Sequence, residues 1–293
     1  MHSSLTIFDD TIRQHINTDF QIELLDSSCS FAEGPVWNRD GYYLFSDIPK
    51  NVICKIEPGK SKEIYLKDAG GSISDTSLLS EQTGSNGLAY DVNGVLYICQ
   101  HGNGAIAKWN GAELQSLLTA TNGKPFNSPN DIVVHSDGSV FFSDPPYGLK
   151  DQKLNPEVRQ NVAAFYCWRG NELTPFCTSF GYPNGVCLSP DETRLYCCSN
   201  KPWERFILEY DVKSLQLIRT VAEENSDGIK CDRAGNIFLC TKEGIFILNS
   251  EGKRMAQIKL DTIPANCCWG GEEGNDLFIT ARENIYLIKN LQK

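Results

Sequence analysis

The chain has 293 residues, of which 27 are Lys or Arg and 37 are Asp or Glu, so its formal net charge is −10. This acidic balance argues against nucleic acids and anionic membranes as partners, because both attract basic surfaces. No apolar run is long enough to span a membrane, and the N-terminal stretch MHSSLTIFDDTIRQH lacks the charged flank and apolar core of a signal peptide. We therefore expect a cytoplasmic protein.

The chain contains 12 cysteines. Most lie in apolar stretches such as LYCCS and IFLC, where Cys behaves as a small hydrophobic residue. No Asn-x-Ser/Thr sequence suggests a secreted glycoprotein. We expect reduced thiols rather than disulfides.

One pattern recurs along the chain in the segments EGPVWNRDGYYLFS, NGLAYDVNGVLYICQ, NDIVVHSDGSVFFSD, NGVCLSPDETRLYCCS, DGIKCDRAGNIFLCT and NCCWGGEEGNDLFITA. Each segment begins with a carboxylate or carboxamide residue: Glu33, Asn86, Asn130, Asn184, Asp227 and Asn266. A turn position follows in each: Gly41, Gly94, Gly138, Glu192, Gly235 and Gly274. Gly accepts positive φ in tight hairpins, and the fourth segment instead has Pro190 and Asp191, which favour a type I turn.

After each turn comes a short apolar and aromatic run, such as YYLFS or VLYIC, that is typical of a buried strand. Further strands follow, such as VICKIEPG and AIAKWNG, and no stretch has sustained helical periodicity. The segments begin 39 to 54 residues apart, which suits propeller blades of about four strands each. We predict an all-β, six-bladed β-propeller, with residues 1–17 as an N-terminal arm and residues 18–293 as a single domain.

Closing such a ring requires a partner for its last edge strand. We expect residues 19–25, DFQIELL, to supply the outer strand of the last blade. The two longest connections, residues 67–84 and 144–161, are polar and contain Gly or Pro, and we expect them to form the rim or lid of a site.

The first strand of each propeller blade lines the central channel, so the six polar residues that begin the segments would form a ring. Its oxygen donors, with no thiolate or imidazole, suit a hard divalent cation, Ca²⁺ before Mg²⁺ or Mn²⁺. Asn-Gly and Asp-Gly pairs are also common turn formers, and any single pair could simply cap the start of a strand. The alignment of all six favours the ring.

The segments EGPVW, SNGLAYD, HGN, NSPNDIVVHSDGSVFFSDPPYGL, PNGVCLSPDETRLY, DGIKCDRAGNIF and PANCCWGG closely resemble the regucalcin/gluconolactonase family, especially its bacterial-type gluconolactonases. The resemblance implies a six-bladed propeller that hydrolyses sugar lactones with one divalent ion, Ca²⁺ first and Mg²⁺, Mn²⁺ or Zn²⁺ as alternatives. It implies metal ligands at Glu33, Asn184 and Asp227, and a metal or substrate contact at Asn130.

The chain departs from the family pattern at two places that bear on the substrate. Relatives of regucalcin carry a substrate-binding Arg where Ser128 stands, and gluconolactonases often have an Arg after a segment that here reads Gln100 to Ala105. These differences concern the size and charge of the preferred substrate rather than the metal site.

A lactonase needs a polarised carbonyl and an activated water, and Ca²⁺ acidifies water only weakly. We expect Asp227 to act as both ligand and proton acceptor, with Asp131 as the alternative base. The remaining candidate substrate contacts are His101, Tyr147, Asn86 and Asn266. His101 also fits a structural role, and Tyr147 also fits a packed Pro-Pro-Tyr corner.

The partner we expect is therefore a small lactone, and the protein itself a monomer or weak homo-oligomer. A phosphotriesterase using the same metal site and a non-catalytic Ca²⁺-binding propeller remain alternatives. Signatures of serine hydrolases, zincins, nucleotide-binding loops and zinc ribbons are absent from the sequence.

Overall fold

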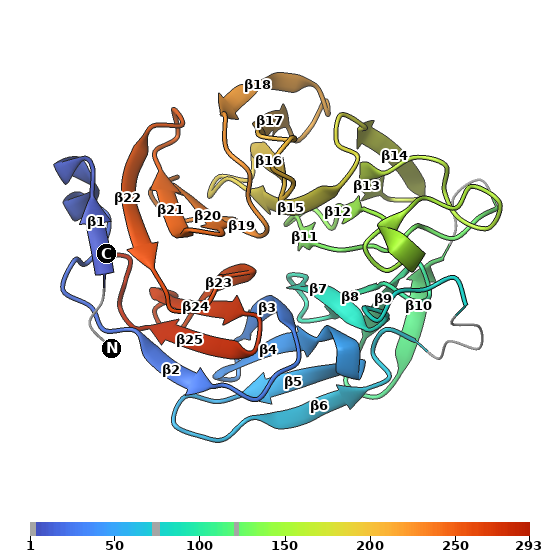
Figure 1. Cartoon of the computed structure of the whole chain (residues 1–293), viewed down its shortest axis with the longest axis horizontal. Coiled ribbons are helices and arrows are strands. Elements are labelled where there is room, and N and C mark those ends of the chain that lie inside the picture. Colours follow the sequence, from blue (N-terminus) through green and yellow to red (C-terminus); the bar gives the residue numbers. More distant parts are fainter. Residues whose placement is uncertain (1–3, 72–76, 120–122) are drawn as a thin grey trace.

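The computed structural model describes residues 4–71, 77–119 and 123–293, and its strands form six antiparallel sheets around a central axis (Figure 1). The predicted six-bladed β-propeller is confirmed. The first three blades contain β3 (Ala32–Asn38), β4 (Tyr42–Asp47), β5 (Val52–Ile56) and β6 (Glu63–Lys67); β7 (Ser85–Tyr90), β8 (Leu96–Gln100), β9 (Ala105–Trp109) and β10 (Leu114–Leu118); β11 (Ile132–Val134), β12 (Val140–Asp144), β13 (Ala164–Arg169) and β14 (Glu172–Cys177).

The last three blades contain β15 (Pro183–Leu188), β16 (Arg194–Ser199), β17 (Ile207–Asp211) and β18 (Leu217–Ala222); β19 (Ile229–Cys231), β20 (Ile237–Thr241), β21 (Gly244–Leu248) and β22 (Arg254–Lys259); β23 (Asn266–Gly270), β24 (Asp276–Ala281) and β25 (Asn284–Ile288). The described helices are short 3-10 turns: η1 (Asp10–Gln14), η2 (Ile48–Lys50) and η3 (Lys150–Gln152). None of the helices in the described ranges could span a membrane.

The N-terminus closes the ring, as the sequence predicts. Strand β2 (Glu23–Asp26) pairs with β25 and supplies the outer strand of the last blade. A second N-terminal strand, β1 (Ser4–Ile7), was not expected from the sequence and pairs with β22 as a fifth strand of the fifth blade (Figure 1). Ile12 and Ile16, which follow β1, are fully buried in the core cluster that joins these two blades.

The six predicted hairpin turns all adopt positive φ. Gly41 has φ 94° and Gly138 has φ 87°, while Glu192, at the fourth turn, takes φ 56°. The fourth hairpin thus keeps the left-handed conformation with a residue other than Gly, at the cost of some backbone strain.

Hydrophobic clusters fill the space between neighbouring sheets. The first and last blades meet where Tyr43 stacks on Phe278 with a centroid distance of 4.2 Å. All twelve cysteines are free thiols, and eleven of them are buried. They pack as small apolar residues between the blades; for example, Cys197 of β16 shares a core cluster with Phe141 of β12 in the preceding blade.

The two long connections meet above the channel. Leu79 forms a β-bridge with Leu149, and the Ser80 amide donates to the carbonyl of Gly148 at 3.0 Å. Residues 72–76 of the first connection lie outside the described residues.

Candidate active site

The six polar residues that begin the repeats are brought together at one end of the channel. The innermost strands β3, β7, β11, β15, β19 and β23 surround the axis, and each contacts the next (Figure 1). Glu33, Asn86, Asn184 and Asn266 lie at the starts of four of these strands, whereas Asn130 and Asp227 lie two residues before β11 and β19. All but Asp227 are at most 4% exposed.

Glycines that follow these polar residues allow the inner strands to approach closely. A Cβ on Gly34 would lie 2.1 Å from the backbone oxygen of Asn86, and a Cβ on Gly87 would lie 2.5 Å from that of Asn130. Gly185 meets the backbone oxygen of Asp227 in the same way, at 2.5 Å. The Asn-Gly pairs therefore serve contact between blades rather than hairpin turns.

Side-chain amides link the ring into a hydrogen-bonded chain. Asn86 Nδ2 donates to Asn130 Oδ1 at 2.7 Å, Asn130 Nδ2 to Asn184 Oδ1 at 2.9 Å, and Asn184 Nδ2 to Asp227 Oδ1 at 2.6 Å. This chain fixes the orientation of each amide and leaves carbonyl oxygens with spare lone pairs.

Two carboxylates of the ring, the buried Glu33 and the half-buried Asp227, lie close together. Burial and the neighbouring Asp227 raise the pKa of Glu33 well above its ordinary value. Burial likewise raises the pKa of Asp227 to about 6. Within the described ranges, neither carboxylate forms an ion pair with Lys, Arg or His. Two carboxylates this close together lose solvation and repel each other when both are charged, so a cation bound between them would stabilise their charged forms.

Both carboxylates line a cavity of about 130 Å³, hereafter the inner cavity. Asn86, Asn130, Asn184 and Tyr147 also line it. Tyr147 comes from the long connection 144–161, and its hydroxyl donates to Asn200 Oδ1 at 2.8 Å. The two long connections thus reach the site.

The sequence analysis missed several residues that line the inner cavity: Phe31, Ile48, Gln82, Gln152, Asn200 and Lys201. A signal for some of them was present in the repeat. Ile48 follows β4, and Asn200 and Lys201 follow β16, the corresponding strand of the fourth blade. Residues just after the second strand of a blade thus reach the same end of the channel as the ring.

His101 contacts a residue of the ring, Asn86, but does not itself line the inner cavity. It is fully buried, and burial lowers its pKa to about 4, so the imidazole is neutral at physiological pH. Its Nδ1 lies 3.0 Å from the carbonyl oxygen of Gln82, which can only accept, so the proton is on Nδ1. Its Nε2 can then accept from Asn86 Nδ2 at 3.1 Å, and we assign His101 the task of orienting that amide.

Asn266 and Asp131 lie deeper in the channel than the inner cavity. Asn266 hydrogen-bonds the Glu33 side chain, and its Oδ1 accepts from Lys230 Nζ at 3.3 Å. Asp131 Oδ2 lies 3.6 Å from the same Lys230 ammonium and accepts from the Val186 amide at 3.2 Å. Asp131 therefore has a cationic partner, in contrast to Asp227.

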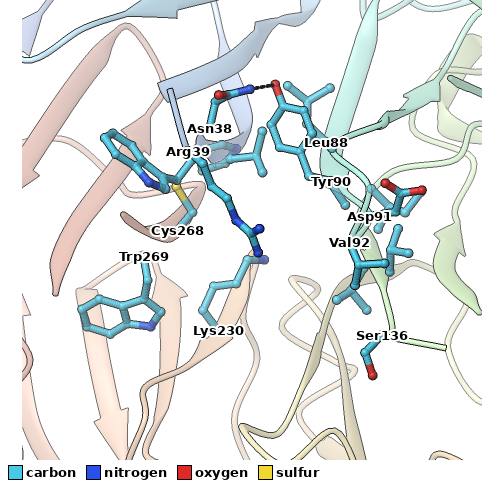
Figure 2. Close-up of a pocket in the computed structure, with 18 of the residues that line it drawn as sticks. Asn38, Arg39, Leu88, Tyr90, Asp91, Val92, Ser136, Lys230, Cys268 and Trp269 are labelled. Atoms are coloured by element: carbon cyan, nitrogen blue, oxygen red, sulfur yellow. Dashed lines mark hydrogen bonds between the residues drawn. The ribbon is translucent and has the colours of Figure 1, made fainter. Parts of the chain in front are cut away.

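A larger cavity of about 590 Å³ occupies the opposite mouth of the channel (Figure 2). It is lined by residues of the inner hairpins, among them Asn38, Arg39 and Tyr90, and by Lys230 at its centre. Asn38 Nδ2 donates to the Tyr90 hydroxyl at 2.8 Å. Size alone would favour this mouth as the active site. Glu33 and Asp227 do not line it, so we place the reactive centre at the ring.

The donor chemistry of the ring fits a divalent cation. Glu33 and Asp227 have carboxylate oxygens, Asn130 and Asn184 have amide oxygens, and all four residues line the inner cavity. Hard cations such as Ca²⁺ prefer oxygen ligands of these kinds. A bound dication would also balance the negative charges of Glu33 and Asp227.

Comparisons with known proteins agree with this fold. Residues 31–283 match the family described as SMP-30/Gluconolactonase/LRE-like region. The chain is 31% identical to a gluconolactonase from Zymomonas mobilis over 306 residues, covering 97% of this chain and 85% of that protein.

Two solved structures show the same fold. A gluconolactonase from Xanthomonas campestris has a TM-score of 0.85 at 24% identity, covering 99% of this chain and 95% of that one. Regucalcin from Agrobacterium tumefaciens, a calcium-binding protein, has a TM-score of 0.71 at 15% identity, covering 94% and 95%. The match over residues 31–283 and the relative from Zymomonas mobilis place this chain in the SMP-30/gluconolactonase/LRE-like family.

Proposed function

We propose that this protein is a metal-dependent lactonase, a carboxylic-ester hydrolase that opens the ring of sugar lactones. The observation that carries the proposal is the pair of carboxylates, Glu33 and Asp227, which line one small cavity where burial raises the pKa of both. Family membership and the likeness to the gluconolactonase from Zymomonas mobilis support a lactone as the substrate.

Glu33, Asn130, Asn184 and Asp227 would hold the cation, with Ca²⁺ our first choice and Mg²⁺, Mn²⁺ or Zn²⁺ as alternatives. When bound, a divalent cation supplies Lewis-acid polarisation of the lactone carbonyl. Asn86 lines the same cavity and is held by His101, so its amide is a preorganised group for orienting the substrate.

Asp227 is our choice for the proton acceptor. It lines the inner cavity, so it lies within reach of a water bound there. Asn184 donates to its Oδ1 at 2.6 Å and Asn200 also hydrogen-bonds the carboxylate, so the side chain is held in a fixed orientation. Asp131 is the weaker candidate, because Lys230 and backbone amides already engage its carboxylate.

We further propose a reducing, cytoplasmic compartment, which the twelve free thiols support.

A panel assay tests the proposed activity. The purified protein is supplied in turn with Ca²⁺, Mg²⁺, Mn²⁺ and Zn²⁺. Ring opening of several sugar lactones is measured as the release of protons. We expect turnover of at least one lactone with at least one cation. Faster hydrolysis of a phosphotriester would favour the phosphotriesterase alternative. Cation binding without turnover of any substrate would favour a non-catalytic propeller.

A further inference from the structure

A second hollow adjoins the inner cavity and is here called the outer chamber. It measures about 420 Å³ and shares Phe31, Asn200, Lys201 and Asp227 with the inner cavity. The inner cavity, at about 130 Å³, is well below the roughly 300–1,000 Å³ of ordinary ligand pockets. A substrate whose carbonyl reaches the ring must therefore extend into the outer chamber.

The outer chamber is basic, although the chain as a whole has a net charge of −10. Lys201, Lys242 and Arg282 line it, and its only carboxylate is Asp227. Among the described residues, none of these three cations forms an ion pair. Lys242 and Arg282 immediately follow the second strands of the fifth and sixth blades, and Lys201 is the second residue after the second strand of the fourth.

Lys201 stands at the junction of the two hollows and is the only cation that lines the inner cavity within the described ranges. Its ammonium lies 4.2 Å from the ring centroid of Tyr182 and 5.0 Å from that of Tyr147. Its one hydrogen-bond acceptor is Gln152 Oε1, at the long distance of 3.4 Å. The two tyrosine faces hold the ammonium in place, while most of its donor capacity is unused.

Two carboxylates, Asp227 and Glu204, attract the Lys201 ammonium, but among the described residues neither forms an ion pair with it. Glu204 Oε1 accepts from the Gly181 amide at 2.7 Å, and Oε2 accepts from the Ser199 hydroxyl at 2.6 Å, so Glu204 is turned towards its own loop. Asp227 is engaged by the amides of Asn184 and Asn200. A half-buried ammonium with no ion pair is a ready site for an anion, because a charge-assisted hydrogen bond there replaces lost solvation.

We infer that the preferred substrate is an anionic sugar lactone, whose second acidic group, a carboxylate or a phosphate, binds Lys201 in the outer chamber while the lactone carbonyl meets the ring. Lys242 and Arg282 add a positive field that attracts such a substrate. This inference rests on the proposed lactonase function and specifies its substrate class.

Three lactones test it with the cation-loaded protein: glucono-1,5-lactone, which is neutral, glucaro-1,4-lactone, which carries a carboxylate, and 6-phosphoglucono-1,5-lactone. We expect kcat/KM for at least one anionic lactone to exceed that of the neutral one by about tenfold or more, mainly through KM. The better of the two anionic lactones identifies the acidic group.

Variants then assign the preference to Lys201. Lys201→Gln should reduce the ratio of anionic to neutral kcat/KM by about tenfold, and Lys201→Arg should retain most of it. Arg39→Gln is the matched control, because Arg39 lines the opposite mouth and loses the same charge (Figure 2). It should leave the ratio unchanged.

The two proposals can fail separately. Turnover of the neutral lactone with no preference for either anionic one, or a preference that Lys201→Gln does not reduce, overturns the anionic substrate and leaves the lactonase standing. If no lactone is opened, calorimetric titration with gluconate, glucarate and 6-phosphogluconate still decides the anion site. Tighter binding of a doubly acidic ligand that is lost in Lys201→Gln supports it, and equal binding of all three overturns it.

Discussion

The backbone oxygen of Asn86 lies only 2.1 Å from the position that a Cβ on Gly34 would occupy. Gly34 also has φ 55°, a conformation that side chains other than Gly rarely adopt. The first and second blades can therefore meet at the ring only because this position has no side chain. Glu33 is the preceding residue, so the same contact sets the place of its carboxylate.

Gly34→Ala should consequently destabilise the protein by about 3 kcal/mol or more, because a backbone clash adds to the strain of positive φ. Gly41→Ala is the matched control, since Gly41 also has positive φ but a Cβ there would have nothing within 4 Å. We expect it to cost only about 1–2 kcal/mol. Urea unfolding of the three proteins measures both values, and equal losses would show that the blade contact is not the cause.

The ion pair between Asp131 and Lys230 should be structural. Lys230→Met leaves a buried carboxylate unpaired and should cost about 3–5 kcal/mol of unfolding free energy. The double variant Lys230→Met with Asp131→Asn should recover part of that loss. A double-mutant cycle by urea unfolding measures the coupling, and strictly additive losses would contradict the pairing.

Substitutions of the two candidate bases, Asp227 and Asp131, should have different effects on kcat. Asp227→Asn should reduce kcat by about 10²-fold or more, because it removes the proton acceptor. Asp131→Asn should have a much smaller effect on kcat in the fraction of protein that is folded. Initial rates at a saturating cation concentration compare the two, and a larger loss for Asp131→Asn would transfer the role of base to Asp131.

Asp144 should make stability depend on pH. Burial raises its pKa from 3.8 to about 7, although the amides of Asn127 and Ser128 donate to it. Between about pH 4 and pH 7 the folded protein keeps a proton that the unfolded chain has lost, so this group's contribution to stability falls as the pH rises. The whole effect is at most about 4 kcal/mol, at 1.36 kcal/mol per pKa unit.

Asp144→Asn lacks this titration and serves as the comparison. The unfolding free energy of the wild type, relative to the variant, should fall by up to about 3 kcal/mol between about pH 5 and pH 8. A constant difference across this range would mean that the folded pKa is not raised.

Cation binding should stabilise the fold. A ligand that binds only the folded state at about 100 times its Kd adds about 2.7 kcal/mol, so Tm should rise by several degrees and return after chelation. Glu33→Gln should abolish the rise, whereas Arg39→Gln should keep it. An equal rise in Glu33→Gln would place the cation elsewhere.

The repeat made most of this architecture predictable. Six aligned polar residues defined the ring, and the position of Glu33 followed from its equivalents in the other blades. The pairing of Ser4–Ile7 with Arg254–Lys259 could not be predicted, because residues 19–25 already supply the strand that closes the ring and a propeller blade does not require a fifth strand. Lys201 was not predicted as a site residue, because it follows an apolar strand whose sequence indicates only a buried core. The ion pair of Asp131 with Lys230 joins two different repeats, so neither residue alone indicated it.

The central claim is that the carboxylates of the ring perform lactone hydrolysis with a bound cation. The most direct test is kcat/KM for a sugar lactone, measured at a saturating cation concentration for the wild type and for Glu33→Gln. We predict metal-dependent turnover that falls by about 10²-fold or more in the variant. Turnover that persists unchanged in Glu33→Gln, or that does not depend on the cation, would contradict the claim.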